Sequence, residues 1–155
     1  MAQADRDSAK ETRARYRRFI PITTRWADND AYGHVNNVAY YSYFDTAVNQ
    51  HLIGRGALDV TRSQEIGVVV ETMCRYFKPV AFPDKLEAGL RLGKLGKSSV
   101  RYEIGIFRAG DDDAAAAGHF VHVYVRRAGF AVVPVPDPVR RAAEELTVKN
   151  RGGTS

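Results

Sequence analysis

Hydrophobic residues recur at spacings of three and four between Val38 and Ile53, and this period predicts a helix. The segment is apolar over much of its circumference, so we expect a sheet to wrap around it. Glycines directly after Ile53 are typical of a helix end. Asn36 or Asn37 is suited to the N-cap, because a side-chain oxygen there can accept from the first free backbone N–H groups.

Alternating apolar and polar positions elsewhere predict strands. The first strand precedes the helix, and its proline, Pro21, is typical of an edge position or a strand start. The predicted strands are 19–26, 66–77, 85–95, 99–108 and 116–127, with 130–135 either extending the last one or following it. A short helix is predicted at 139–146. One long helix against five to six antiparallel strands is an α+β arrangement.

The chain of 155 residues has the length of one domain. We expect residues 1–18 to form a polar, disordered leader, 19–147 the folded domain and 148–155 a polar tail. No apolar run approaches the roughly 20 residues that a membrane helix needs, and the leader lacks the apolar core of a signal peptide. The single cysteine, Cys74, excludes an intrachain disulfide. Together these features favour a cytoplasmic protein.

The net charge is +5, with basic residues in both tails and in the body of the chain. Solvated tails are the simplest interpretation of the terminal charges, and we expect no nucleic-acid partner because no binding motif accompanies them. The basic residues of the body are suited to attract an anionic substrate, such as a phosphorylated cofactor. They include Arg75, Lys78, Lys85, Arg91, Lys94 and Lys97.

Reactive side chains gather directly before the predicted long helix. Residues 28–37 hold two aspartates, a histidine, a glycine and three asparagines, and two of these asparagines are Asn36 and Asn37. The N–H groups at a helix start are unpaired and carry partial positive charge. They can hold a developing oxyanion while a nearby carboxylate acts as base or nucleophile. The sequence therefore predicts a reactive site at the start of the helix.

The chain resembles hotdog-fold acyl-CoA thioesterases of the 4-hydroxybenzoyl-CoA thioesterase type. Three stretches carry the resemblance: Asp-Asn-Asp-Ala-Tyr-Gly-His-Val-Asn-Asn at 28–37, the tyrosines after it, and Gly-Lys-Ser-Ser at 96–99. The resemblance covers about 19–146. It implies a long central helix wrapped by a curved antiparallel sheet, and a homodimer or homotetramer with active sites at the dimer interface. It also implies hydrolysis of an acyl-CoA to a free acid and coenzyme A. The 4-hydroxybenzoyl enzyme lacks His-Val-Asn-Asn, so the resemblance does not name the acyl group.

By position, the resemblance implies that Asp30 is the catalytic carboxylate and that the backbone N–H near Asn37 is the oxyanion donor. Asp30 either attacks the thioester or activates water. His34 either caps the helix or lies buried, or else it orients substrate or protonates the leaving thiolate. Asp28 either holds the turn by hydrogen bonds or a salt link with Arg25, or else it has a supporting role in catalysis.

Substrate contacts are expected from five further residues. A glycine at the tight turn allows a positive φ, and an asparagine orders the helix start. An aromatic residue of the helix is suited to line the acyl pocket, while a serine and a lysine are candidates for the thioester arm and its phosphates. These residues are Gly33, Asn36, Tyr40, Ser98 and Lys78.

No metal site is expected, because His119 and His122 lie on a predicted strand without a matching set of ligands. No cofactor is expected either, since coenzyme A is part of the substrate. Two alternative functions remain. One is a non-catalytic acyl-CoA binding module. The other is an acyl-carrier-protein thioesterase, which a basic surface would suit equally well.

Overall fold

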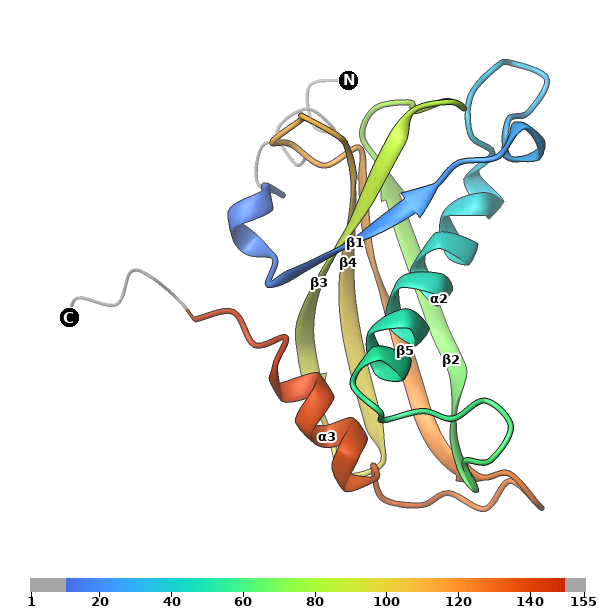
Figure 1. The fold of residues 1–155 in the computed structure, drawn as a ribbon, viewed down its shortest axis with the longest axis vertical. Coiled ribbons are helices and arrows are strands. Elements are labelled where there is room, and N and C mark those ends of the chain that lie inside the picture. Colours follow the sequence, from blue (N-terminus) through green and yellow to red (C-terminus); the bar gives the residue numbers. More distant parts are fainter. Residues whose placement is uncertain (1–10, 150–155) are drawn as a thin grey trace.

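A long helix lies across one face of a five-stranded antiparallel sheet in the computed structural model, which describes residues 11–149 (Figure 1). The strand order is β1-β3-β4-β5-β2, so β1 and β2 form the two edges. The elements are η1 (Arg13–Arg15), β1 (Arg18–Thr23), η2 (Trp26–Asp28), α2 (Asn37–Gly54), β2 (Glu65–Tyr76), β3 (Lys85–Leu95), β4 (Ser99–Arg108), β5 (Ala116–Arg126) and α3 (Asp137–Glu144). This arrangement confirms the predicted α+β class and the hotdog fold.

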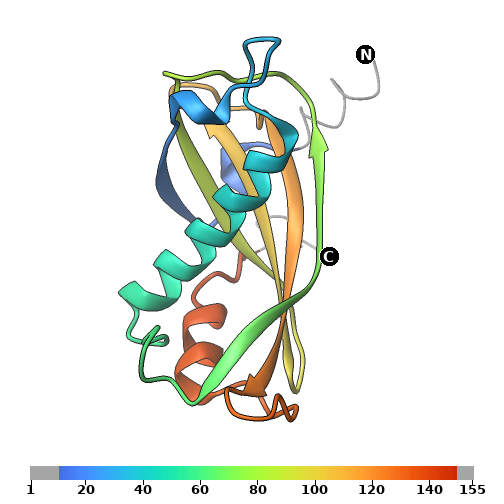
Figure 2. The same ribbon diagram turned by 90° about the vertical axis from the view of Figure 1, so that its right-hand side faces the viewer.

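The sheet covers only one face of α2. Its strands curve around the helix, as the two views in Figures 1 and 2 show. The opposite face stays open within one chain, where Val38 is 66% exposed and Ile53 is 49% exposed. The expectation that the sheet wraps most of the helix is therefore met on one side only. The buried stripe of α2 consists of Tyr40, Tyr43, Phe44, Ala47, Val48, His51 and Leu52.

Residues at every second position of the central strands face α2 and are buried, as expected for strands with one side against the core. They interlock with the buried stripe of α2 in one continuous hydrophobic core. The inward positions of β3 and β4 are Leu86, Ala88, Leu90, Val100, Tyr102, Ile104 and Ile106.

Within residues 11–149, no helix is both long and apolar enough to cross a membrane.

Three predicted elements differ from the structure by more than one residue at a boundary. The first strand ends at Thr23 rather than at 26, because the chain turns into η2. Residues 130–135 form no ladder; Val132 makes one isolated bridge to Val125, and the prolines around it cannot donate backbone hydrogen bonds. The last helix begins at Asp137, two residues earlier than expected, since a proline is tolerated in the first turn.

Residues 11–17, which we expected in a disordered leader, pack against the sheet on the face away from α2. The ring of Tyr16 fills a groove over Gly89 and Gly105, which pair across β3 and β4. A Cβ at either glycine would lie 2.9 or 2.7 Å from this ring. The ring also meets Phe107 edge-on at 5.5 Å between centroids. The folded unit therefore begins before residue 19, while residues 1–10 and 150–155 lie outside the described residues.

Replacing Tyr16 with alanine is expected to lower the free energy of unfolding by about 3 kcal/mol, because the large buried ring leaves an unfilled groove. Urea denaturation measures this change. Arg17→Ala is the matched control, since Arg17 is the exposed neighbour of Tyr16. Equal stability of the two variants would contradict a stabilising role for the segment.

Candidate active site

The polar turn before α2 is a short hairpin. The Asp30 N–H donates to the His34 carbonyl at 2.8 Å, and the Gly33 N–H donates to the Asp30 carbonyl at 3.1 Å. Gly33 closes the turn with a φ of +82°, a conformation that glycine adopts without strain. The glycine is therefore required by the geometry of the backbone at this point.

Asp28 anchors this turn to the helix. Its Oδ2 accepts the Tyr43 hydroxyl at 2.8 Å and the Arg25 N–H at 2.9 Å, while its Oδ1 accepts the Arg25 guanidinium at 2.8 Å. Burial alone would raise the pKa of Asp28, but these hydrogen bonds outweigh it and hold the pKa below its ordinary value. The predicted salt link with Arg25 is confirmed, and both oxygens of Asp28 are occupied.

Asp30 differs from Asp28 although only one residue separates them. It is partly exposed, and its Oδ1 accepts the Tyr32 N–H at 2.8 Å in a local turn. Within residues 11–149 its second carboxylate oxygen has no hydrogen-bond partner. Asp30 therefore retains an oxygen that can accept a proton or attack a carbon atom.

The N-cap of α2 is Asn36, and Asn37 is the first helical residue. The Asn36 side chain accepts the Val38 N–H at 3.1 Å, and its carbonyl accepts the Ala39 N–H at 2.9 Å. The Asn37 N–H has no partner in the part of the chain that the structure describes. The cap thus leaves one free donor at the positive end of the helix dipole, where an oxyanion is favoured.

A cavity of about 270 Å³ opens beside this helix start. Its wall includes four residues expected in the site, His34, Asn37, Tyr40 and Lys78, which the fold brings together. Asp30 does not line it but sits across the hairpin from His34. The remaining lining residues are Val35, Tyr76, Phe77 and Pro79.

The sequence analysis missed Tyr76 as a site residue. Its hydroxyl donates to the Asn37 carbonyl at 3.0 Å, and its ring meets Tyr40 edge-on at 5.0 Å. Burial raises the pKa of Tyr40 to about 12, and burial also raises the pKa of Tyr76. Both hydroxyls therefore stay protonated near neutral pH. In the sequence pattern Tyr76 is an ordinary strand residue, because only the packing of β2 on α2 brings it to the helix start.

For three residues expected in the site, the structure shows surroundings that differ from those expected or that limit their part in the site. His34 is exposed, so the expectation that it caps the helix or lies buried is wrong. Lys78 forms an ion pair with Asp111 at 3.2 Å. Ser98 lies in the turn between β3 and β4, where its carbonyl accepts the Tyr124 N–H at 2.8 Å. This turn is at the far end of the sheet from the start of α2 (Figure 1).

The family model described as the Thioesterase-like superfamily matches residues 24–143. The chain belongs to this superfamily. The match contains the polar turn, the whole of α2 and all strands from β2 to β5. Within residues 11–149, no three His, Cys, Asp or Glu side chains are grouped so that they could hold a metal ion.

Solved structures similar to this chain agree with the fold. The PA5185 protein of Pseudomonas aeruginosa is 52% identical, covers 88% of this chain and 96% of its own, and superposes with a TM-score of 0.87. The PA2801 protein of the same organism, a candidate thioesterase, is 34% identical over 82% of this chain and 98% of its own, with a TM-score of 0.76. The gentisyl-coenzyme A thioesterase BH1999 is 26% identical, with coverages of 81% and 99% and a TM-score of 0.72.

These relatives confirm the resemblance to hotdog-fold thioesterases and assign this thioesterase-like chain to the thioester hydrolases in general. Their names do not identify its acyl group or its thiol carrier. The structure explains how residues of the polar turn hold its conformation. Asp28 holds the turn, Gly33 closes it, and Asn36 caps the helix, which leaves the Asn37 N–H without a partner among the described residues.

Tyr43→Phe is expected to lower the free energy of unfolding by about 2 kcal/mol at pH 7, because it removes a hydrogen bond to a buried carboxylate. The folded pKa of Asp28 is depressed, so its stabilising effect is present above the unfolded value of about 4 and is lost as the pH falls through the folded value. The difference from the unsubstituted protein should therefore shrink at low pH.

Urea denaturation at pH 7 and at pH 3 measures both effects. Tyr32→Phe serves as the control, since Tyr32 is 87% exposed. A difference that stays constant with pH would show that Asp28 does not depend on Tyr43.

Proposed function

We propose that this protein is an acyl-CoA thioesterase, which hydrolyses a thioester to a free carboxylic acid and coenzyme A. The observation that carries the proposal is the Asn37 N–H at the start of α2, which has no partner within residues 11–149. It lies beside a cavity and next to the turn that carries Asp30. An oxyanion donor and an available carboxylate are the two parts that thioester hydrolysis needs. The likeness to a gentisyl-coenzyme A thioesterase supports the choice of coenzyme A as carrier.

In the proposed reaction the thioester carbonyl oxygen accepts the Asn37 N–H. Asp30 either adds to the carbonyl carbon or takes a proton from the water that adds to it, so a C–O bond forms. The C–S bond then breaks, and the thiolate of coenzyme A leaves and is protonated. On the route in which Asp30 adds directly, this leaves a mixed anhydride on Asp30, and water then cleaves the anhydride to release the free acid and restore the carboxylate. In this proposal His34, which is exposed and lines the cavity, supplies that proton or orients the substrate. Water is the only co-reactant, so no cofactor is needed.

The remaining site residues have supporting roles in this proposal. Gly33 and Asn36 shape the backbone around the carbonyl, while Tyr40 forms an aromatic wall for the acyl group. Lys78 lines the cavity, but its ammonium group forms an ion pair with Asp111. Ser98 lies too far along the sheet to reach the same chain's site. It would therefore have to come from a second chain.

A homodimer through β2 supplies this second chain. β2 is a 12-residue edge strand, and an edge of that length exposes a row of unpaired backbone groups. Val69 is 47% and Val70 is 58% exposed on it, and Val38 is 66% exposed on the neighbouring open face of α2. Antiparallel pairing of two β2 edges brings the far end of one sheet towards the helix start of the other. We propose that the active unit is this dimer, alone or within a tetramer.

Asp30→Asn is expected to reduce the rate of thioester hydrolysis by roughly 100-fold or more, because the amide is neither a base nor a nucleophile. Thiol release from a panel of coenzyme A thioesters, from acetyl to palmitoyl and including aromatic acyl groups, measures the rate. Asp113→Asn is the control, since Asp113 is an exposed carboxylate at the tip of the β4–β5 hairpin.

Full activity of Asp30→Asn would remove Asp30 from the mechanism. Binding of acyl-CoA without any thiol release would instead favour a non-catalytic binding module. Hydrolysis limited to thioesters of an acyl carrier protein would favour the carrier-protein enzyme.

Val70→Lys is expected to shift the dimer towards monomer and to lower activity in parallel, because a charge at the shared edge opposes strand pairing. Light scattering after gel filtration gives the mass of the assembly over a range of concentrations. Val132→Lys is the matched control, since Val132 is 65% exposed outside the named strands. An active monomer would contradict the shared site.

A further inference from the structure

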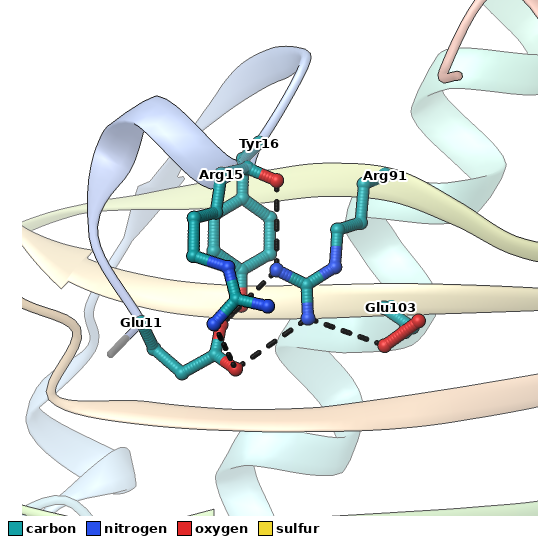
Figure 3. A network of polar contacts seen from close by, with 5 residues as sticks. All are labelled: Glu11, Arg15, Tyr16, Arg91 and Glu103. Carbon is teal, nitrogen blue, oxygen red and sulfur yellow. Dashed lines mark hydrogen bonds and ion pairs between the residues drawn. The ribbon is translucent and has the colours of Figure 1, made fainter. Parts of the chain in front are cut away.

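A second cavity, of about 340 Å³, lies on the face of the sheet away from α2, which we call the outer-face cavity. Figure 3 looks onto this face, with α2 behind the strands. Its walls come from η1 and its flanking residues and from β2, β3, β4 and β5. Most of its charged groups are arginines, namely Arg15, Arg75, Arg91 and Arg101, which are accompanied by Glu11 and Glu103.

Part of this charge is neutralised within the cavity. Arg91 forms ion pairs with Glu11 at 3.1 Å and with Glu103 at 3.2 Å, and its guanidinium lies 4.6 Å from the centroid of the Tyr16 ring. Arg15 forms an ion pair with the same Glu11 at 3.6 Å (Figure 3). The two glutamates are therefore already engaged by these two arginines.

Arg75 and Arg101 have no such partners. Within residues 11–149, neither guanidinium forms a hydrogen bond or an ion pair. They lie on β2 and β4, on either side of β5, and both line the outer-face cavity. Uncompensated positive charge in a concave site concentrates anions, and the guanidinium fork matches the oxygens of a phosphate group. The cavity is therefore suited to an anionic ligand.

A buried histidine supports this assignment. His119 lies on β5 between the two arginines and lines the same cavity, with 9% of its surface exposed. Its Nε2 lies 2.8 Å from a Glu71 oxygen, whereas its Nδ1 has no partner in the described chain. A buried polar atom without a partner costs free energy, and a bound ligand or water removes that cost.

The outer-face cavity and the cavity beside α2 meet at the end of β2. Phe77 lines both. Of the two residues before it, Arg75 lines the outer-face cavity and Tyr76 lines the cavity beside α2, as the alternation of a strand requires. A ligand with its reacting group at Asn37 and a flexible arm can therefore pass the end of β2 and place its anionic end at Arg75.

We propose that the outer-face cavity binds the phosphate groups of the coenzyme A nucleotide, with Arg75 and Arg101 as the main contacts. This inference rests on the proposed acyl-CoA thioesterase function. Among the basic residues named in the sequence analysis, it selects Arg75 over Lys78 and Arg91, because these two are engaged by carboxylates. The same acyl group carried on pantetheine, which lacks the nucleotide, makes none of these contacts.

The test compares the double variant Arg75→Gln and Arg101→Gln with the unsubstituted protein on two thioesters of one acyl group, one on coenzyme A and one on pantetheine. The ratio of kcat/KM for the coenzyme A thioester to that for the pantetheine thioester should fall about tenfold or more, through KM, because charge-assisted contacts to phosphate are lost. Arg62→Gln with Arg126→Gln is the matched control, since both arginines are exposed and lie outside the cavity.

Binding of adenosine 3′,5′-bisphosphate, measured by calorimetry, gives a readout that is independent of catalysis. It should bind the unsubstituted protein and inhibit competitively, and it should bind the double variant at least tenfold more weakly. An unchanged kinetic ratio overturns the inference while thioester hydrolysis stands. Absence of hydrolysis by the unsubstituted protein overturns the proposed function. Absence of bisphosphate binding, or equally tight binding of inorganic phosphate, overturns the nucleotide site.

Discussion

The buried carboxylate of Asp28 is the contact on which the arrangement of the site depends. It accepts hydrogen bonds from Tyr43, in the second turn of α2, and from Arg25, before the polar turn. This ties the turn and the helix into one rigid unit and gives the helix start a defined position. Asp30, just beyond it, keeps one carboxylate oxygen without a partner in the part of the chain that the structure describes. Two aspartates in one motif thus have different surroundings, since only Asp28 is buried with both oxygens hydrogen-bonded.

At the start of α2, too, neighbouring groups of one type differ in their hydrogen bonding. Asn36 occupies the N–H groups of Val38 and Ala39, and this leaves the N–H of Asn37 for a ligand. The other face of α2 packs against the sheet, which fixes the position of the helix beside the cavity. Because α2 is covered on one side only and β2 is an open edge, the site has room for a second chain beside it.

Much of this could be predicted, because it depends on neighbours in the sequence. The period of α2, the alternation of β3 and β4, the cap at Asn36 and the turn at Gly33 are all local properties. Tyr16 and Tyr76 were missed for a common physical reason. Tyr16 is buried only because Gly89 and Gly105, on two other strands, leave room for its ring. The hydroxyl of Tyr76 reaches α2 only through the register of the sheet.

The amino-acid sequence by itself determined the long helix, the strands, the capped turn and the thioesterase-like motif, since hydrophobic period and turn chemistry act over a few residues. Only the tertiary structure decided which charges remain available. Lys78 and Arg91 are engaged by Asp111 and Glu11, which are distant in sequence, while Arg101 has no partner among the described residues 11–149. A charge is neutralised by whatever the fold brings within a few ångströms of it, and no local pattern records that distance.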